Sequence, residues 1–228
     1  MQISKPNTTK ALRMPLGSEY TLPVRDWGQL AWTLLLLNSI RRGGLEGIGS
    51  LRFHRLQFFA NSLAPIYEER PPVELVMKLE RGPYYPDAQD DIDTLCVCGL
   101  ADVKLVEWHS SGSRMWKTAD YEITKAGIEL ASRLATESQW CGRLATFLDD
   151  LVLAYTDLAD GVLDAVALKD VTYAQKGKSL GDIIPFSLER NLGVRASGAI
   201  ADLLPSDFAP NRRNRLRMYL RYLEQLAA

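Results

Sequence analysis

The sequence predicts an α+β fold that is mostly α-helical, and three observations lead to this prediction. Apolar residues repeat at helical spacing through much of the chain from Asp26 onward. Two β-like segments, 102–108 and 115–123, alternate apolar and polar residues and flank a polar turn that contains glycine. Apolar residues make up 46% of the 228 residues and charged residues 24%, which supports a sizeable core and excludes intrinsic disorder.

The first two helices are predicted between Asp26 and Pro65. Asp26 is a suitable N-cap for the first helix, Gly43 ends it, and a second helix begins at Ser50 and stops at Pro65. The residues of the second helix expected to face inward are Leu51, Leu56, Phe59, Ala60 and Leu63. Those expected to face outward are Arg52, Arg55 and Asn61.

A third helix is predicted after a proline-rich stretch. Segment 73–79 fits either a short strand or a helical turn, and periodicity leaves both open. Pro86 suits the first position of the third helix, and Gly99 suits its end. The apolar face comprises Ala88, Ile92, Leu95 and Cys96. The carboxylates expected on the other faces are Asp87, Asp90, Asp91 and Asp93.

The order of three helices, a hairpin and a further helix capped by Thr124 is the order of a winged helix-turn-helix domain. We therefore expect an N-terminal arm over residues 1–24, a winged-helix domain over 25–138 and a helical C-terminal domain over 139–228. The last helix is predicted after Pro210. Its apolar side comprises Leu216, Tyr219, Leu220, Leu223 and Leu226.

Three segments resemble one family of proteins. They are the helix segment 52–60 (RFHRLQFFA), the loop and acidic helix from 81 to 95 (RGPYYP, then DDIDTL), and the junction 121–127 (YEITKAG). In this order they are similar to segments of bacterial YwgA-like and Panacea-type winged-helix proteins. Similar domains occur in the middle components of bacterial three-part ABC-ATPase conflict systems. The resemblance covers roughly residues 28–180, and segment 167–171 departs from the family pattern.

The resemblance implies an accessory, antitoxin-like or regulatory protein of a bacterial defence locus, and it does not imply an enzyme. Protein partners encoded nearby would then be expected. The alternatives are a DNA-binding transcriptional regulator and, less favoured, a nucleotide-binding protein.

Charge and cysteine content restrict the classes of function. The chain has 27 Lys and Arg against 28 Asp and Glu, so no overall field attracts nucleic acid or acidic lipid. Three cysteines are too few for a disulfide framework, which favours a reducing cytoplasm. The first twenty residues lack the apolar core of a signal peptide, and the apolar run 30–37 is too short to span a membrane.

Motifs for catalysis, metals or cofactors are weak, so we expect none of the three. The two histidines lie far apart, and Cys96-Val97-Cys98 is one residue short of the usual metal-binding spacing. The segment 175–179 (QKGKS) ends like a phosphate-binding loop but lacks its first glycine and a preceding strand. The aspartates between Asp87 and Asp93 lack the glycine turn of an EF-hand, which favours a solvated face.

Conventional DNA recognition is disfavoured because the helix before the hairpin is acidic. No basic residue lies between Pro86 and Gly99, and carboxylates repel phosphates. The residues that remain as possible nucleic-acid contacts are Arg52, Arg55, Arg114 and Lys117.

The last helix carries an arginine cluster: Arg212, Arg213, Arg215, Arg217 and Arg221. Arginine binds carboxylates and phosphates through a planar fork, which favours an acidic protein partner, with the nucleic-acid backbone as the alternative. An ordinary solvated face is an equally good interpretation. The predicted partner-binding residues are Asp87, Asp90, Asp91, Arg212, Arg213, Arg217 and Arg221.

Overall fold

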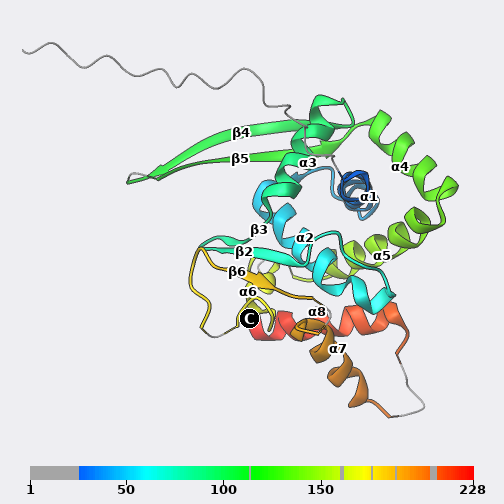
Figure 1. The fold of residues 1–228 in the computed structure, drawn as a ribbon, viewed down its shortest axis with the longest axis vertical. Helices are drawn as coiled ribbons and strands as arrows, with labels where there is room; N and C mark the ends of the chain where they lie inside the picture. The colour runs from blue at the N-terminus through cyan, green and yellow to red at the C-terminus, as the bar shows by residue number, and fades with distance from the viewer. Residues whose placement is uncertain (1–25, 113, 160–161, 176, 188, 206–209) are drawn as a thin grey trace, which may run out of the picture.

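The structure, a computed structural model, confirms an α+β protein that is mostly α-helical (Figure 1). It describes residues 26–112, 114–159, 162–175, 177–187, 189–205 and 210–228, so the arm expected over 1–24 lies outside the described residues. The helices are α1 (Trp27–Arg42), α2 (Ser50–Leu63), the 3-10 helix η1 (Ala64–Tyr67), α3 (Pro86–Val97), α4 (Lys125–Glu137), α5 (Gln139–Thr156), α6 (Leu163–Lys169), α7 (Leu192–Asp202) and α8 (Arg212–Ala227). The strands are β1 (Ile48–Gly49), β2 (Leu75–Leu79), β3 (Gly82–Tyr84), β4 (Ala101–Ser111), β5 (Arg114–Ile123) and β6 (Ile183–Pro185).

The described strands form two small antiparallel sheets. In the first sheet β5 lies between β1 and β4, with Ile48 opposite Tyr121 and Ala101 opposite Ile123. In the second sheet β2 lies between β3 and β6. The segment 73–79, which the sequence left open between a strand and a helical turn, therefore contains the central strand of the second sheet.

Side-chain caps fix the starts of several helices. Asp26 Oδ1 accepts a hydrogen bond from the Gly28 amide (2.8 Å), and Thr124 Oγ1 accepts one from the Gly127 amide (3.1 Å). These caps satisfy amides that have no partner within the helix, so the starts of α1 and α4 predicted from the sequence are confirmed. The other capping side chains are Ser138, Asn191 and Asn211.

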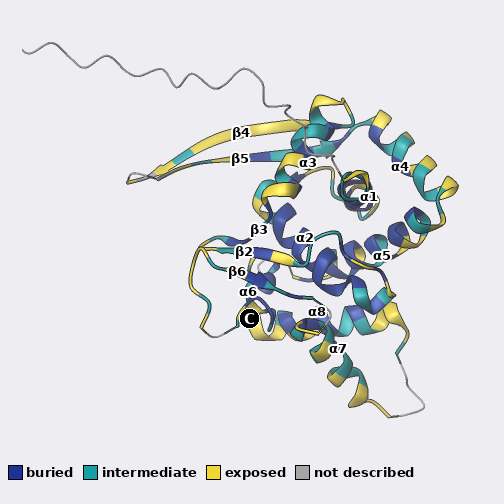
Figure 2. Ribbon diagram, in the orientation of Figure 1, coloured by how far each residue is buried: buried dark blue, intermediate teal, exposed yellow. Residues whose placement is uncertain are grey.

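One hydrophobic core extends through the described chain (Figure 2). Helices α1 and α5 pack together, with the Trp32 and Phe147 ring centroids 6.3 Å apart. Helix α8 contributes four fully buried residues to the same core: Leu216, Tyr219, Leu220 and Leu223. Leu226, which the sequence also placed on this side, is 45% exposed. The core is thus continuous across the boundary expected between residues 138 and 139.

Helix α2 lies inside the molecule, and its burial differs from the sequence-based expectation. Every residue from Phe53 to Leu63 is buried, because β3, β5, α5 and α6 pack around the helix. Arg55 and Asn61, expected outside, are buried, whereas Leu51, expected inside, is 39% exposed. A helix that is enclosed on all sides has no polar face for periodicity to detect.

A buried carboxylate connects the end of α6 to α8. Asp170 accepts hydrogen bonds from the Tyr219 hydroxyl (2.7 Å) and from the Thr172 amide (2.8 Å). Burial raises the pKa of Asp170, and the hydrogen bonds it accepts oppose that shift. A buried carboxyl group needs such donors to offset its lost hydration, so this contact fixes the position of α8 against the body.

The β4–β5 hairpin projects beyond the body of the molecule (Figure 1). It extends past the predicted limits, 102–108 and 115–123, on both strands. A bulge between Lys104 and Glu107 sets Leu105 and Val106 against the single residue Ala119 of β5. Leu105 has a φ of 45°, a left-handed conformation that is costly for a branched side chain.

Candidate partner-binding surfaces

Helix α3 presents carboxylates on one side. Pro86 and Asp87 occupy its first turn, where the helix dipole favours a negative charge. Asp87 and Asp90 are exposed, so both are accessible, as the sequence-based interpretation requires. The structure corrects the expectation for Asp91, which is only 4% exposed. Its spacing of three and four residues from Ala88 and Leu95 places it on the buried stripe of the helix.

The start of α3 is anchored on α2. The Tyr85 amide donates a hydrogen bond to His54 Nδ1 (3.4 Å), and the Tyr84 ring lies 4.6 Å from the imidazole. Gln89 Nε2 donates to the Tyr121 hydroxyl (2.8 Å), which ties the same end of α3 to β5. Burial lowers the pKa of His54 to about 4, so the imidazole is neutral near pH 7 and accepts the Tyr85 hydrogen bond.

The carboxylates of α3 influence neighbouring groups. The pKa of Tyr84 is raised by burial first and then by the charges of Asp90 and Asp93. The pKa of the Cys96 thiol is raised in the same way by burial, Asp93 and Asp102. For both groups burial is the larger cause of the raised pKa, and the nearby carboxylates add to it.

The hairpin exposes apolar side chains that the core does not use. Those that are at least half exposed are Leu105 (73%), Val106 (50%), Trp108 (68%) and Met115 (72%). The sequence predicted the hairpin but not the exposure of Leu105 and Val106. The signal that could have found them is the adjacent apolar pair, which breaks the alternation of a regular strand. Exposed apolar side chains that gather on one element are typical of interaction surfaces.

The opposite face of the hairpin is supported by the second sheet. The Arg81 guanidinium, at the turn between β2 and β3, lies 3.3 Å from the centre of the Trp116 ring. His109 stacks on that ring with centroids 5.4 Å apart, and its Nε2 is 2.7 Å from Thr118 Oγ1. These contacts hold the projecting strands in place, since an isolated two-stranded hairpin is marginally stable in water.

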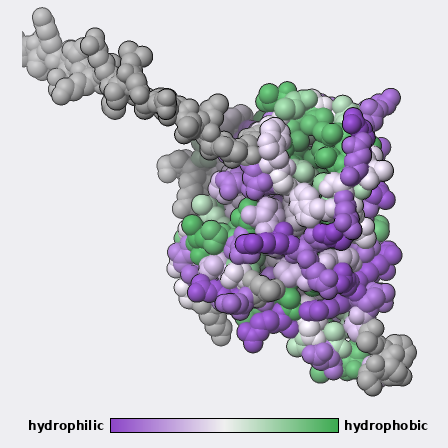
Figure 3. Space-filling view, turned by 45° about the vertical axis from the view of Figure 1, so that its right-hand side comes forward, coloured by the Kyte–Doolittle hydropathy of each residue, from purple (hydrophilic) through white to green (hydrophobic). Residues whose placement is uncertain are grey.

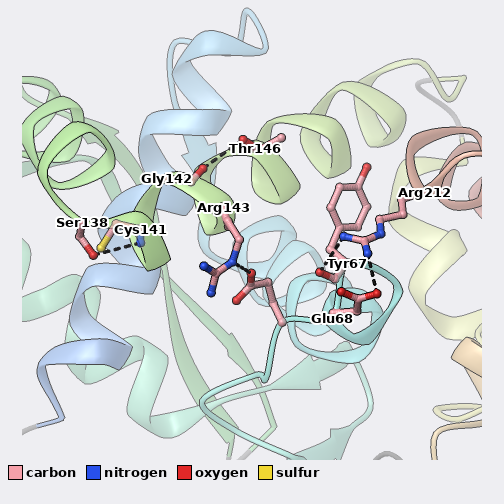
Figure 4. Close-up of polar contacts among 9 residues, drawn as sticks. Tyr67, Glu68, Ser138, Cys141, Gly142, Arg143, Thr146 and Arg212 are labelled. Atoms are coloured by element: carbon pink, nitrogen blue, oxygen red, sulfur yellow. Dashed lines mark hydrogen bonds and ion pairs between the residues drawn. The ribbon is translucent and has the colours of Figure 1, made fainter.

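The arginines of α8 mostly contact carboxylates and carbonyls of this chain. The ion pairs are Arg212 with Glu68, Arg213 with Asp150 (3.2 Å), Arg217 with Asp157 (3.1 Å) and Arg221 with Glu224 (2.7 Å). Arg212 also donates to the Tyr67 carbonyl (Figure 4). Arg215 donates to Ser197 Oγ (3.1 Å) and to the Val194 carbonyl (3.0 Å). Arg212, Arg213, Arg217 and Arg221 stay partly exposed, and the partner surface expected here stays a prediction.

The face of the molecule shown in Figure 3 is largely hydrophilic, with separate hydrophobic areas. Besides the α8 pairs, Arg143 of α5 contacts the carboxylate of Glu69 (2.8 Å), which is buried. Ion pairs between arginines and carboxylates therefore connect α5 and α8 to the segment that follows α2.

The possible nucleic-acid contacts differ in their surroundings. Arg55 is buried and contacts Asp164 (2.5 Å) and the Arg81 carbonyl (2.9 Å), which corrects its expected outward position. Arg52 is partly exposed and lies 3.6 Å from the same Asp164 carboxylate. Lys117 is exposed on the hairpin, and the side chain of Arg114 lies outside the described residues.

The segment that resembles a phosphate-binding loop is closed by a carboxylate. The Ser179 amide donates to Asp182 Oδ2 (2.8 Å), and the Lys178 carbonyl accepts from Lys78 Nζ (3.1 Å). An amide that already binds a carboxylate does not point into an open anion cradle. Among the described residues, no group of three or more His, Cys, Asp or Glu side chains could hold a metal ion.

Comparison with known proteins gives no matching family model and no similar curated protein. Within the described ranges, no helix is both long and apolar enough to cross a membrane.

Proposed function

We propose that the winged helix-turn-helix domain expected over residues 25–138 acts as a protein-binding adaptor. The element order α1, β1, α2, α3, β4, β5 and the sheet order β1-β5-β4 support this domain. Strands β2 and β3 would then be an insertion between the second and third helices. This insertion supports the hairpin through Arg81 and Trp116.

One observation carries the functional proposal: the helix in the recognition position is acidic and accessible. In a DNA-binding winged helix this helix enters the major groove, where phosphates require basic side chains. Here it presents Asp87 and Asp90, and its negative potential reaches Tyr84. The partner that fits is a protein with a basic surface. Following the resemblance of the sequence, we propose that it is another component of a bacterial defence or conflict system, encoded nearby.

A charge reversal on α3 tests the proposal. The variant Asp87→Lys with Asp90→Lys should keep the parent melting temperature, because both residues are exposed, and it should lose binding to its partner. The measurement is capture of each purified product of the neighbouring genes by the full chain. The matched control is Glu129→Lys with Glu137→Lys on α4, whose carboxylates are also exposed. Equal binding by both variants and the parent would remove α3 from the interface.

DNA binding is the second candidate, and the exposed Lys117 beside Trp108 on the hairpin is the observation that favours it. A hairpin contact with the phosphate backbone would depend strongly on salt. Binding of the purified chain to duplex DNA that weakens with added salt and with Lys117→Glu would support this candidate over the adaptor.

A further inference from the structure

Within the part of the chain that the structure describes, no strand pairs with the outer edge of β4. In its sheet β5 pairs with β1 only at Asp120 and Tyr121, whereas β4 pairs with β5 alone along its length. The outer side of β4 therefore offers backbone groups that can pair with another strand. Most of its side chains are exposed, and the apolar ones include Leu105, Val106 and Trp108.

The bulge changes which residues share a face of β4. Lys104 lies opposite Asp120 and Glu107 opposite Thr118, so one extra residue enters β4 between them. Residues opposite one another in an antiparallel pair share a face, and β5 alternates without interruption. Two sets of residues follow. One face of β4 carries Asp102, Lys104, Glu107 and His109, and the other carries Ala101, Val103, Trp108 and Ser110.

Contacts within the strand agree with this division. Lys104 Nζ lies 3.4 Å from Asp102 Oδ2, and His109 Nε2 lies 3.7 Å from Glu107 Oε2. Both pairs are two residues apart on the charged face. The exposed Val103 (41%) and Trp108 (68%) occupy the other face.

We propose that β4 pairs antiparallel with β4 of a second copy of this chain, around a two-fold axis that passes between Leu105 and Val106. In a regular strand this register would set residues of different faces opposite one another. The extra residue at the bulge shifts the alternation by one, so residues of the same face lie opposite one another. The opposing pairs, each formed twice, are Lys104 with Glu107, Asp102 with His109, Val103 with Trp108 and Ala101 with Ser110.

The register is self-complementary in charge as well as in face. A two-fold interface requires a surface that complements itself, and Lys104 opposite Glu107 meets this requirement on both sides of the axis. Opposite charges and apolar pairs directly across strands stabilise a sheet, and this register sets no like charges opposite one another. The bulge lies on the axis, so backbone hydrogen bonds form on either side, between 101–104 of one copy and 107–110 of the other. The paired strands would cover Leu105 and Val106 of both copies.

Single charge reversals and their mixture test the proposal. The full chain should dimerise reversibly in sedimentation velocity over a concentration series. Lys104→Glu alone and Glu107→Lys alone each create two like-charge pairs, and each should weaken dimerisation by about tenfold or more. An equal mixture of these two variants restores opposite charges in both pairs. The introduced glutamate of one copy then faces the introduced lysine of the other, and the unchanged Glu107 faces the unchanged Lys104. The mixture should therefore dimerise about as well as the parent.

The control reverses a charge pair away from the hairpin. Lys125→Glu and Glu129→Lys on α4 should each leave dimerisation unchanged. Melting temperatures verify that all variants fold. A parent that stays monomeric throughout the series overturns the proposal. So does dimerisation that single reversals leave unchanged, or a mixture that associates no better than its components. None of these results bears on α3, so the adaptor proposal is tested independently.

Discussion

Helices α3 and α8 both carry a run of like charges, but the surroundings of the two runs differ. On α8, Arg213 and Arg217 contact Asp150 and Asp157. On α3, no ion pair to Asp90 occurs within the described residues. The same kind of sequence signal therefore marks an intramolecular contact in one helix and an accessible charged surface in the other. The two helices differ in the charge of the segments that pack against them.

Packing explains this difference. Helix α8 lies against α5 and the end of η1, where Glu68, Asp150 and Asp157 supply carboxylates. Its position is fixed by the buried contact between Tyr219 and Asp170. Helix α3 lies against α1 and β4, and its inner stripe is apolar apart from Asp91. On its outer side Asp87 and Asp90 are exposed, and Asp93 accepts a hydrogen bond from Gln89 of the same helix (3.0 Å).

The largest contrast between α8 and α3 should be in the free energy of unfolding after truncation of one apolar residue in each helix. Leu220 of α8 is fully buried, and Val97 of α3 is 89% exposed. Leu220→Ala should lower the free energy of unfolding by about 2–5 kcal/mol, because it leaves a cavity in the core. Val97→Ala should change it by less than about 0.5 kcal/mol. Chemical denaturation of both variants provides the measurement. Similar losses for the two would mean that α8 is not integrated into the core.

Acidification should weaken the anchor of α3. The pKa of His54 is lowered by burial from 6.5 to about 4, so the unfolded chain binds more protons than the folded chain between these values. The contribution of His54 to stability is present above pH 6.5 and is lost as the pH falls toward 4, by up to about 3 kcal/mol. Protonation also removes the acceptor that His54 Nδ1 offers to the Tyr85 amide.

The measurement is the free energy of unfolding of the parent and of His54→Asn across this pH range. The parent should lose more stability on acidification than the variant, which lacks the titrating ring. Parallel pH profiles would contradict the assignment of this loss to His54.

Sequence patterns predicted the local features of the fold and much less of its long-range contacts. The caps at Asp26 and Thr124 and the hairpin follow from neighbouring residues, so periodicity and turn chemistry were sufficient. The burial of Arg55 depends on Asp164, which is distant in sequence, and no local pattern contains that information. The pairing of β6 with β2 was missed for the same reason, since β6 is three residues long and lies far along the chain from β2.

The candidate surfaces show the same limit. The accessibility of Asp87 and Asp90 was predictable from their distance to the apolar stripe of α3. The position of Asp91 on that stripe is also implied by its spacing from Ala88 and Leu95. The carboxylates beside Arg213 and Arg217 could not be assigned without the packing of α8 on α5.

Removal of one arginine should measure how much the α8 pairs contribute to stability. Arg213→Ala removes a contact with Asp150, whose carboxylate also accepts from the Tyr67 hydroxyl (2.7 Å). Since the arginine is partly exposed and its charge is screened by water, the loss should be about 0.5–1 kcal/mol. It should shrink in high salt, as surface ion pairs do. Thermal unfolding at low and high salt checks both expectations. A salt-independent loss would indicate lost packing of the side-chain stem instead.

The smallest effect is expected for Asp90→Asn on α3. The side chain is exposed and its charge has no cation nearby within the described residues, so the free energy of unfolding should stay within about 0.5 kcal/mol of the parent. The substitution should instead act on Tyr84, whose pKa is raised by burial and by the charges of Asp90 and Asp93. Removal of one charge should lower that pKa toward its usual value, while burial and Asp93 keep it above that value. Ultraviolet or NMR titration of the phenol in the parent and the variant gives the comparison. An unchanged titration would show that the field of α3 does not reach its surroundings, and it would weaken the case that this helix attracts a basic partner.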